Sequence, residues 1–328
     1  VYRIFIDDKI KEYENIFSKN YSNFIFCDVN SDKKKDIVLF EKSNTDGNPD
    51  IKGTLYCFGS ENCESVDEFT VDPAISTVCS IVTDYNKETG NTRIYVDGYK
   101  TDTGMTTDLV IWDSFENSFV RPESIDYIST ATAATRSKNI FCADTDSDSV
   151  VEIPLEEQIS KSSVYSSKLT ESKPQDVIKW VEYDGYALTP EKYEIFISEY
   201  NYSIVISPEN YGKFTVKNDL DSGTLTFFEL ENDQYFAAPN NKKPPKKSDD
   251  NKHDDMHNQP EGFDTENELK DKALFSILAA AEQDYGIYEL SGYRAICSDN
   301  GFTYYYQIYE SGKTAGVTKE TIKSILVT

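Results

Sequence analysis

Short apolar runs separated by turn-forming residues recur from residue 22 to residue 190 of this chain. Runs that alternate apolar and polar positions between clusters of Gly, Pro, Asn, Asp and Ser are typical of β-strands. Residues 1–8 form a similar run at the start of the chain. The remaining runs predict three passes, each a group of four strands that follow one another in sequence: Asn23–Asp28, Asp36–Glu41, Gly53–Phe58, Val66–Val71; Thr77–Thr83, Thr92–Tyr99, Asp108–Trp112, Phe119–Pro122; and Asn139–Ala143, Ser149–Pro154, Asp176–Tyr183, Tyr186–Thr189.

Four strands in succession are the content of one blade of a β-propeller. The expected fold is therefore mainly β, with a partial β-propeller over residues 1–190 that contains about three four-stranded blades plus a fragment. Because a ring cannot close on that number of blades, we expect further blades upstream of Val1 in a longer protein.

The pattern changes near residue 191, and residues 191–328 are expected to form a small α+β domain. Its helix is predicted over Thr318–Leu326, with Thr318 as the N-cap. Residues 239–268 are rich in Asn, Lys, Asp and Pro, and are expected to be a disordered insertion in a loop. The predicted strands of this domain lie within Tyr202–Lys217, Gly223–Leu230, Leu274–Ala279, Tyr293–Cys297 and Thr303–Tyr309.

Two acidic loops, residues 28–36 and 144–152, lie between predicted strands. A loop with oxygen-bearing side chains at positions 1, 3, 5 and 9, and a backbone carbonyl at position 7, supplies most of the roughly six to eight ligands of Ca²⁺. The alternative is a polar turn whose side chains only bind nearby N–H groups. We expect one Ca²⁺ in each loop, held by Asp28, Asn30, Asp32, the Lys34 carbonyl and Asp36, and by Asp144, Asp146, Asp148, the Val150 carbonyl and Glu152.

A third segment, Asp84–Gly90, opens 56 residues after Asp28 and 60 residues before Asp144. It is stretched and lacks the closing carboxylate. We interpret it as a degenerate copy that keeps the turn without binding an ion.

Composition excludes some partners. The chain has 33 Lys and Arg against 58 Asp and Glu, a net charge of −25. Neutralising phosphates requires a basic face, so nucleic acid is not an expected partner, and neither is an anionic membrane surface. No apolar run reaches about 18 residues, so no transmembrane segment is expected. The hydrophobic fraction of 38% is low, but 23 Tyr and 18 Phe allow a sizeable core.

The six cysteines do not form a metal-binding pattern, because no Cys-x-x-Cys and no histidine partner accompanies them. Cys57 and Cys63 flank a short loop, and whether they form a disulfide is left open. The other three cysteines of the first 190 residues are expected to be small buried hydrophobes: Cys27, Cys79 and Cys142.

No catalytic motif is present, and both histidines, His253 and His257, lie in the expected disordered insertion. They could hold a transition metal weakly, but a solvated tract is favoured. The tyrosines of Tyr304–Tyr309 could stack on sugar rings, but the alternation of a half-buried strand also explains them, and this second interpretation is favoured. Trp112 and Trp180 are expected to pack between blades. A pair of carboxylates could still hydrolyse glycosides, since that chemistry needs only two acidic residues.

Residues 26–40 resemble the FG-GAP/VCBS repeat of integrin-type β-propellers. Arg93–Leu109 and Asp144–Pro154 resemble, more narrowly, VCBS-repeat lipoproteins of Gram-positive gut bacteria, and the resemblance covers about residues 1–190. Ser207–Val216 is similar in kind to PsbP-like domains. Position 6 of the two acidic loops is Lys33 and Ser149, where the family prefers Gly; if φ is positive there, a Cβ costs up to about 1 kcal/mol and weakens ion binding.

The resemblance implies an extracellular protein, with membrane attachment only through an N-terminal lipid anchor upstream of this sequence. We expect a calcium-stabilised binding or scaffold module for a carbohydrate or protein ligand, without catalytic activity. The alternative is a cell-surface enzyme acting on polysaccharide, whose catalytic residues lie upstream or among the unassigned carboxylates.

Overall fold

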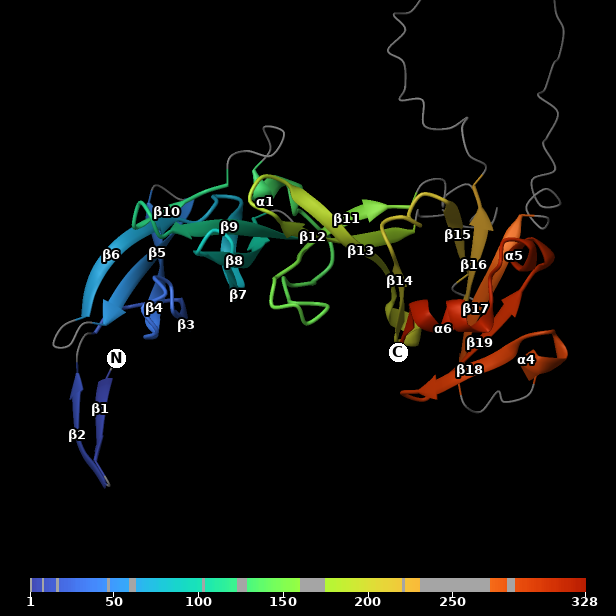
Figure 1. Ribbon diagram of the computed structural model, residues 1–328, viewed down its shortest axis with the longest axis horizontal. Coiled ribbons are helices and arrows are strands. Elements are labelled where there is room, and N and C mark those ends of the chain that lie inside the picture. The colour runs from blue at the N-terminus through green and yellow to red at the C-terminus, as the bar shows by residue number, and fades with distance from the viewer. Residues whose placement is uncertain are drawn as a thin grey trace, which may run out of the picture. The chain divides into compact units, whose positions relative to one another are not determined.

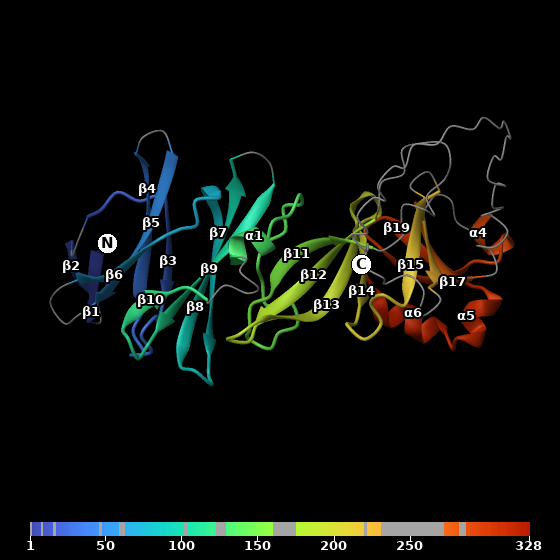
Figure 2. The same cartoon turned by 90° about the horizontal axis from the view of Figure 1, so that it is seen from above.

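A computed structural model describes residues 2–7, 9–15, 18–45, 48–58, 63–101, 104–122, 129–159, 175–219, 222–230, 272–281 and 287–328. The described residues are mainly β, with 58% strand and 9% helix, which confirms the expected class. Its contacts divide it into two units, Val1–Glu157 with Ile178–Tyr193, and Gln158–Val177 with Glu194–Thr328. Figures 1 and 2 show the strands and helices of both units.

The first unit contains two four-stranded antiparallel sheets whose neighbouring strands follow one another in sequence. They confirm the first two predicted passes of strands. A hairpin, β1 (Tyr2–Asp7) with β2 (Lys9–Asn15), precedes them. The first sheet contains β3 (Asn23–Cys27), β4 (Asp36–Thr45), β5 (Asn48–Phe58) and β6 (Cys63–Thr70), and the second contains β7 (Ile75–Asn86), β8 (Asn91–Lys100), β9 (Met105–Asp113) and β10 (Ser118–Val120).

Because successive side chains of a strand point to opposite faces of the sheet, the two faces pack into different cores. Along β4, Val38 and Phe40 join the core shared with the second sheet, and Ile37 and Leu39 join a smaller cluster on the opposite face. Trp112 of β9 is buried in the shared core, as expected. The second sheet is covered on both faces, because alternate residues of β8 and β9 also enter a core with the segment that carries α1 (Thr130–Ala133) and β11 (Ile153–Gln158).

The third predicted pass is wrong in its first strand. Asn139–Ala143 forms only an isolated bridge, between Ala143 and Glu152. Side chains occupy the backbone groups that a strand would use: Asp97 accepts from the Cys142 N–H, and Arg136 donates to the Ile140 carbonyl. The second predicted strand, Ser149–Pro154, begins only at Ile153 as β11.

A five-stranded sheet follows, in the order β11-β12-β13-β14-β20, and the division between the two units falls within β11, β12 and β13. The expected domain boundary at residue 190 lies inside β13, so the domain organisation stays a prediction. The sheets of the described residues do not define a closed ring, and the propeller arrangement also stays a prediction. The remaining strands of this sheet are β12 (Asp176–Tyr183), β13 (Leu188–Ile197), β14 (Tyr202–Ile206) and β20 (Leu326–Val327).

The second unit contains a five-stranded antiparallel sheet in the order β15-β16-β17-β19-β18. Tyr304 and Tyr305 are buried in β19, which favours the packing interpretation of the tyrosine run. The strands are β15 (Phe214–Asp219), β16 (Thr224–Glu229), β17 (Ala273–Ala281), β18 (Arg294–Asp299) and β19 (Phe302–Ile308). The short helices are η1 (Ser198–Tyr200), α4 (Ile287–Leu290), α5 (Glu310–Thr314) and α6 (Lys319–Ile325).

The C-terminal helix is confirmed. The Thr318 hydroxyl accepts from the Thr321 N–H at 3.1 Å, and the Thr321 hydroxyl accepts from the Thr318 N–H, which completes a capping box. Ile322 is its buried residue. The predicted insertion at residues 239–268, with both histidines, lies outside the described residues.

Candidate metal-binding site

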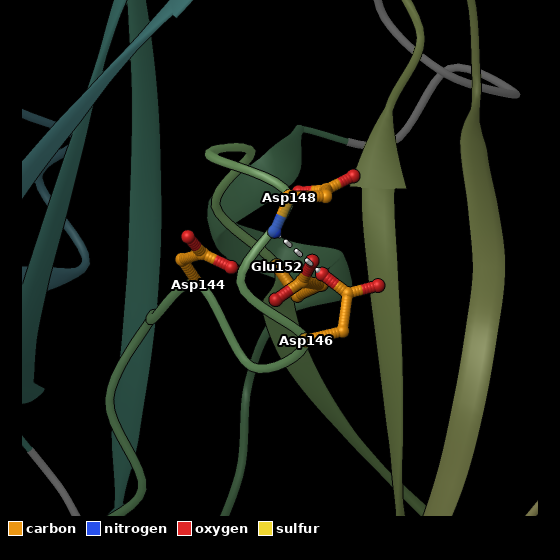
Figure 3. Close-up of side chains that lie close together, drawn as sticks. All are labelled: Asp144, Asp146, Asp148 and Glu152. Atoms are coloured by element: carbon orange, nitrogen blue, oxygen red, sulfur yellow. Dashed lines mark hydrogen bonds between the residues drawn. The ribbon is translucent and has the colours of Figure 1, made fainter.

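The second acidic loop gathers the four carboxylates that the sequence predicted. Oxygen atoms of Asp144, Asp146, Asp148 and Glu152 lie within 4.8 Å of one another, and Figure 3 shows the four side chains together at the loop. The first three residues are exposed and Glu152 is buried. This is a donor set of hard oxygen atoms, which suits a hard cation.

Backbone N–H groups hold these side chains in place. The Asp144 carboxylate accepts from the N–H groups of Ser147 at 2.7 Å and Ser149 at 3.0 Å. Asp146 accepts from the Asp148 N–H at 3.2 Å, and Asp148 accepts from the Val150 N–H at 2.7 Å. Each carboxylate uses one or both oxygens in this way, so the polar-turn interpretation describes part of what the loop does.

Glu152 is the exception that a polar turn does not explain. Its Oε2 accepts from the Thr145 N–H at 2.7 Å, but its Oε1 is buried with no hydrogen-bond partner in the part of the chain that the structure describes. The residue is 0% exposed, and burial, followed by the charge of Asp146, raises the pKa of its carboxyl group. An unpartnered buried carboxylate oxygen is costly unless a cation or a donor satisfies it.

Glu182 of β12 adds to the negative charge of this region. Burial, followed by the charges of Glu191, Asp148 and Glu152, raises the pKa of its carboxyl group to about 7. A bound divalent cation would relieve the same repulsion. The sequence did not single out Glu182, because the proximity of β12 to the loop is a tertiary feature.

The first acidic loop, between β3 and β4, repeats four of the five hydrogen bonds of the second. The missing one is the bond from the Ser147 N–H to Asp144 Oδ1, since no described residue donates to Asp28 Oδ1. The Lys33 N–H donates to Asp28 at 2.9 Å, as the Ser149 N–H does to Asp144. The remaining equivalent bonds run from Asp32 N to Asn30 at 3.0 Å, from Lys34 N to Asp32 at 2.8 Å and from Val29 N to Asp36 at 3.1 Å.

Both loops turn through left-handed residues at the same two positions. The φ values are 63° at Ser31 and 68° at Lys33 in the first loop, and 71° at Ser147 and 77° at Ser149 in the second. The conformation that favours Gly is therefore present at Lys33 and Ser149, where the sequence carries a Cβ.

The first loop does not gather its three aspartates as the second gathers its carboxylates, since only the 144–152 group forms such a cluster in the described part of the chain. Asp36 is buried, and its carboxylate interacts with the Cys57 thiol in addition to the Val29 N–H. Like Glu152 Oε1, Asp28 Oδ1 is nevertheless buried and finds no hydrogen-bond partner among the described residues. The ligand roles of the Lys34 and Val150 carbonyls stay predictions.

The interpretation of Asp84 as the opener of a degenerate loop is wrong. Asp84 lies inside β7, paired in register with Arg93 of β8, and the turn that follows is held by Asn86, whose side chain accepts from the N–H groups of Glu88 and Thr89. The Asp84 carboxylate is buried and bonded to Arg93 Nε at 2.6 Å and Nη2 at 2.8 Å. The sequence offered one signal for this buried ion pair, since Asp84 and Arg93 are charged residues within otherwise apolar strands.

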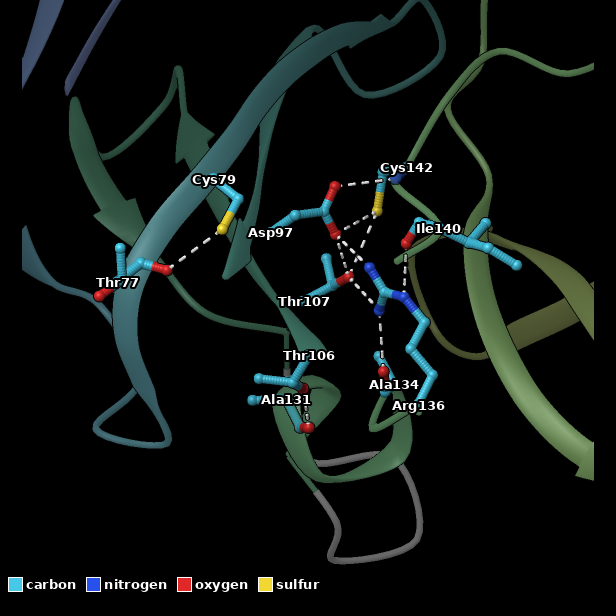
Figure 4. A network of polar contacts seen from close by, with 10 residues as sticks. All are labelled: Thr77, Cys79, Asp97, Thr106, Thr107, Ala131, Ala134, Arg136, Ile140 and Cys142. Atoms are coloured by element: carbon cyan, nitrogen blue, oxygen red, sulfur yellow. Dashed lines mark hydrogen bonds and ion pairs between the residues drawn. The ribbon is translucent and has the colours of Figure 1, made fainter. Parts of the chain in front are cut away.

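A second buried pair lies nearby in the sequence, and Figure 4 shows its surroundings. Asp97 Oδ1 and Arg136 Nη2 are 2.7 Å apart with both side chains fully buried. Thr107 and Cys142 complete the network. Burial raises the pKa of the Cys142 thiol well above its ordinary value, which makes it a poor nucleophile.

Within the described residues, no disulfide joins Cys57 to Cys63. In the β5–β6 ladder Phe58, not Cys57, lies opposite Cys63, and Cys57 packs on the opposite face of the sheet. A disulfide between them would require the strands to change register. Cys27 and Cys142 are buried as expected, and Cys79 is partly buried.

Comparison of the chain with protein-family models and with curated proteins finds no match. Within the described residues, no helix has the length and apolar character needed to cross a membrane.

Proposed function

We propose that this chain is a calcium-stabilised binding or scaffold module, built from propeller-type blades and acting outside the cell without catalysis. The observation that carries the proposal is the second acidic loop, where four carboxylates converge and no described residue donates to the buried Glu152 Oε1. A Ca²⁺ ion would satisfy that oxygen and neutralise part of the local charge. Its flexible coordination suits a loop of mixed side-chain and carbonyl oxygens.

The first acidic loop is proposed as a second, weaker Ca²⁺ site. It shares the left-handed positions and four of the five hydrogen bonds of the second loop, and Asp28 Oδ1 is buried with no hydrogen-bond partner among the described residues. Its weakness is attributed to Asp36, whose carboxylate also engages the Cys57 thiol.

A binding role has a candidate surface on the first sheet. Tyr21, Phe24 and Phe26 are about half exposed and line a groove with Ile37 and Leu39. Neighbouring rings meet edge to face, at 89° for Tyr21 with Phe24 and 77° for Phe24 with Phe26. This surface suits apolar parts of either a protein or a sugar ligand, and an array of glycans and peptides would separate the two.

The calcium proposal is tested by melting the protein with chelator and with excess Ca²⁺. Because a ligand that binds only the native state stabilises it by mass action, Ca²⁺ should raise the melting temperature. Asp148→Ala with Asp32→Ala should abolish the shift. Asp113→Ala is the matched control, since Asp113 accepts from the Phe115 N–H at 2.8 Å in an ordinary turn. Equal melting curves of the wild-type protein with and without Ca²⁺ would overturn the proposal.

A polysaccharide-acting enzyme is the second candidate, and Glu182 is the observation that favours it. A carboxyl group with a pKa of about 7, close to other carboxylates, has the environment of a general acid. Release of reducing sugar from polysaccharide by the wild-type protein, lost in Glu182→Gln, would support this candidate over a purely binding role.

A further inference from the structure

Asp84 touches the second acidic loop from the neighbouring sheet. Its Oδ2 accepts a hydrogen bond from the Val151 N–H at 2.9 Å, and both residues are buried. Val151 stands between two expected Ca²⁺ ligands, the Val150 carbonyl and the Glu152 side chain. The contact therefore reaches the part of the loop that should face the ion.

Because of peptide geometry, this contact also fixes the direction of the Val150 carbonyl. The Val150 carbonyl and the Val151 N–H belong to one peptide group, and the described residues contain no cis peptide bond. In a trans peptide these two groups point in opposite directions. Because Asp84 holds the N–H, the Val150 carbonyl is turned away from Asp84, and no group in the described part of the chain donates to its oxygen.

Asp84 is itself held firmly. Arg93 binds both of its oxygens, and the Tyr95 hydroxyl donates to Oδ2 at 3.0 Å. Arg93 Nη1 also donates to the Tyr183 carbonyl, next to Glu182. The carboxylate that orients the Val150–Val151 peptide is therefore fixed from the second sheet and from β12.

We propose that Asp84 is a positioning residue for the second acidic loop: by holding the Val151 N–H, it presents the Val150 carbonyl to the cation. The inference rests on the proposed Ca²⁺ site. Groups that orient metal ligands commonly change metal affinity by about 10- to 100-fold when they are removed. The first loop has no equivalent: no described side chain accepts from the Lys35 N–H, which follows the Lys34 carbonyl. The effect should therefore be confined to the second loop.

The test is made in the Asp32→Ala background, so that binding reports the second loop. Asp84→Leu with Arg93→Met removes both buried charges together, because removal of Asp84 alone would leave Arg93 unpaired and endanger folding. Tyr95→Phe is the matched control: it removes another hydrogen bond to the same Oδ2 and keeps the Asp84–Val151 contact. Circular dichroism and the melting curve establish that each variant is folded at the temperature of measurement.

Two quantities are measured, the Ca²⁺ dissociation constant by calorimetry and the number of waters on bound Tb³⁺ from luminescence lifetimes in H₂O and D₂O. We expect the double variant to weaken Ca²⁺ binding at least about tenfold and to add about one water where the carbonyl is lost. A merely structural role would not change the water count. Unchanged affinity and water count would overturn the role of Asp84 alone, whereas no Ca²⁺ binding by the Asp32→Ala parent would overturn the site and the inference together.

Discussion

At Glu182, burial and neighbouring charge act in the same direction. Together they raise the pKa of its carboxyl group from the ordinary 4.5 to about 7, with Arg93 as the opposing charge. The folded protein therefore holds a proton at Glu182 more tightly than the unfolded chain does. Stability from this group is fully present below about pH 4.5 and is lost as the pH rises through about 7.

We expect the melting temperature of the metal-free protein to fall between pH 5 and pH 8, and Glu182→Gln to flatten that fall. Ca²⁺ should flatten it as well, because a nearby divalent charge lowers the pKa of Glu182. The measurement is the melting temperature between pH 5 and pH 8, in metal-free buffer and in excess Ca²⁺. If Glu182→Gln melts with the same pH slope as the wild type in metal-free buffer, the interpretation of this residue is wrong.

At the scale of the element, each acidic loop is a turn shaped by its own side chains. Carboxylates and amides accept from N–H groups two to five residues further along the chain, and this winding requires left-handed φ values at Lys33 and Ser149. An L-residue other than Gly is strained there. The loops therefore keep their shape at some cost in stability.

Ser149→Gly should stabilise the protein by up to about 1 kcal/mol, because it removes the Cβ at a φ of 77°. We expect higher Ca²⁺ affinity in the same variant, since less strain remains in the loop. Glu116→Gly is the control, at a turn residue whose φ is not left-handed, and there added chain entropy should destabilise the protein. Urea unfolding measures both; destabilisation by Ser149→Gly would show that the Cβ is accommodated without strain.

At the scale of the first unit, three buried or partly buried ion pairs connect the second sheet to its neighbours. Arg121 binds Asp108 and donates to the Thr70 carbonyl of the first sheet. The other two guanidinium groups each bind an aspartate of the second sheet and a backbone carbonyl further along the chain: Arg93 with Asp84 and the Tyr183 carbonyl, and Arg136 with Asp97 and the Ile140 carbonyl. Each pair fixes how one segment lies against the next.

Asp97→Asn should destabilise the protein by about 3–5 kcal/mol, because it leaves the fully buried Arg136 without its charge partner. Lys52→Ala, which breaks the exposed pair of Lys52 with Glu68, should leave the unfolding midpoint unchanged. Chemical denaturation of the two variants makes the comparison. Similar midpoints for Asp97→Asn and the wild type would mean that the network contributes little beyond packing.

Much of the fold was predictable from local pattern. Alternation along Asp36–Glu41 predicted β4, Thr318 predicted the start of α6, and the spacing of acidic residues in 144–152 predicted which carboxylates converge. These features depend on residues close together in the sequence: strand faces alternate by two, and hydrogen bonds within a loop span a few positions.

Tertiary structure decided the rest, because the deciding partners are far apart in the chain. Asp84 resembles a loop opener by spacing, yet Arg93 and the Val151 N–H make it a buried link to the loop 60 residues later. Asn139–Ala143 has a strand-like pattern, but Asp97 and Arg136 take its backbone groups. Local sequence determined most of the strands and both acidic loops. Which charges are buried together was decided only by packing, since a buried charge is stable only beside a partner that the fold brings to it.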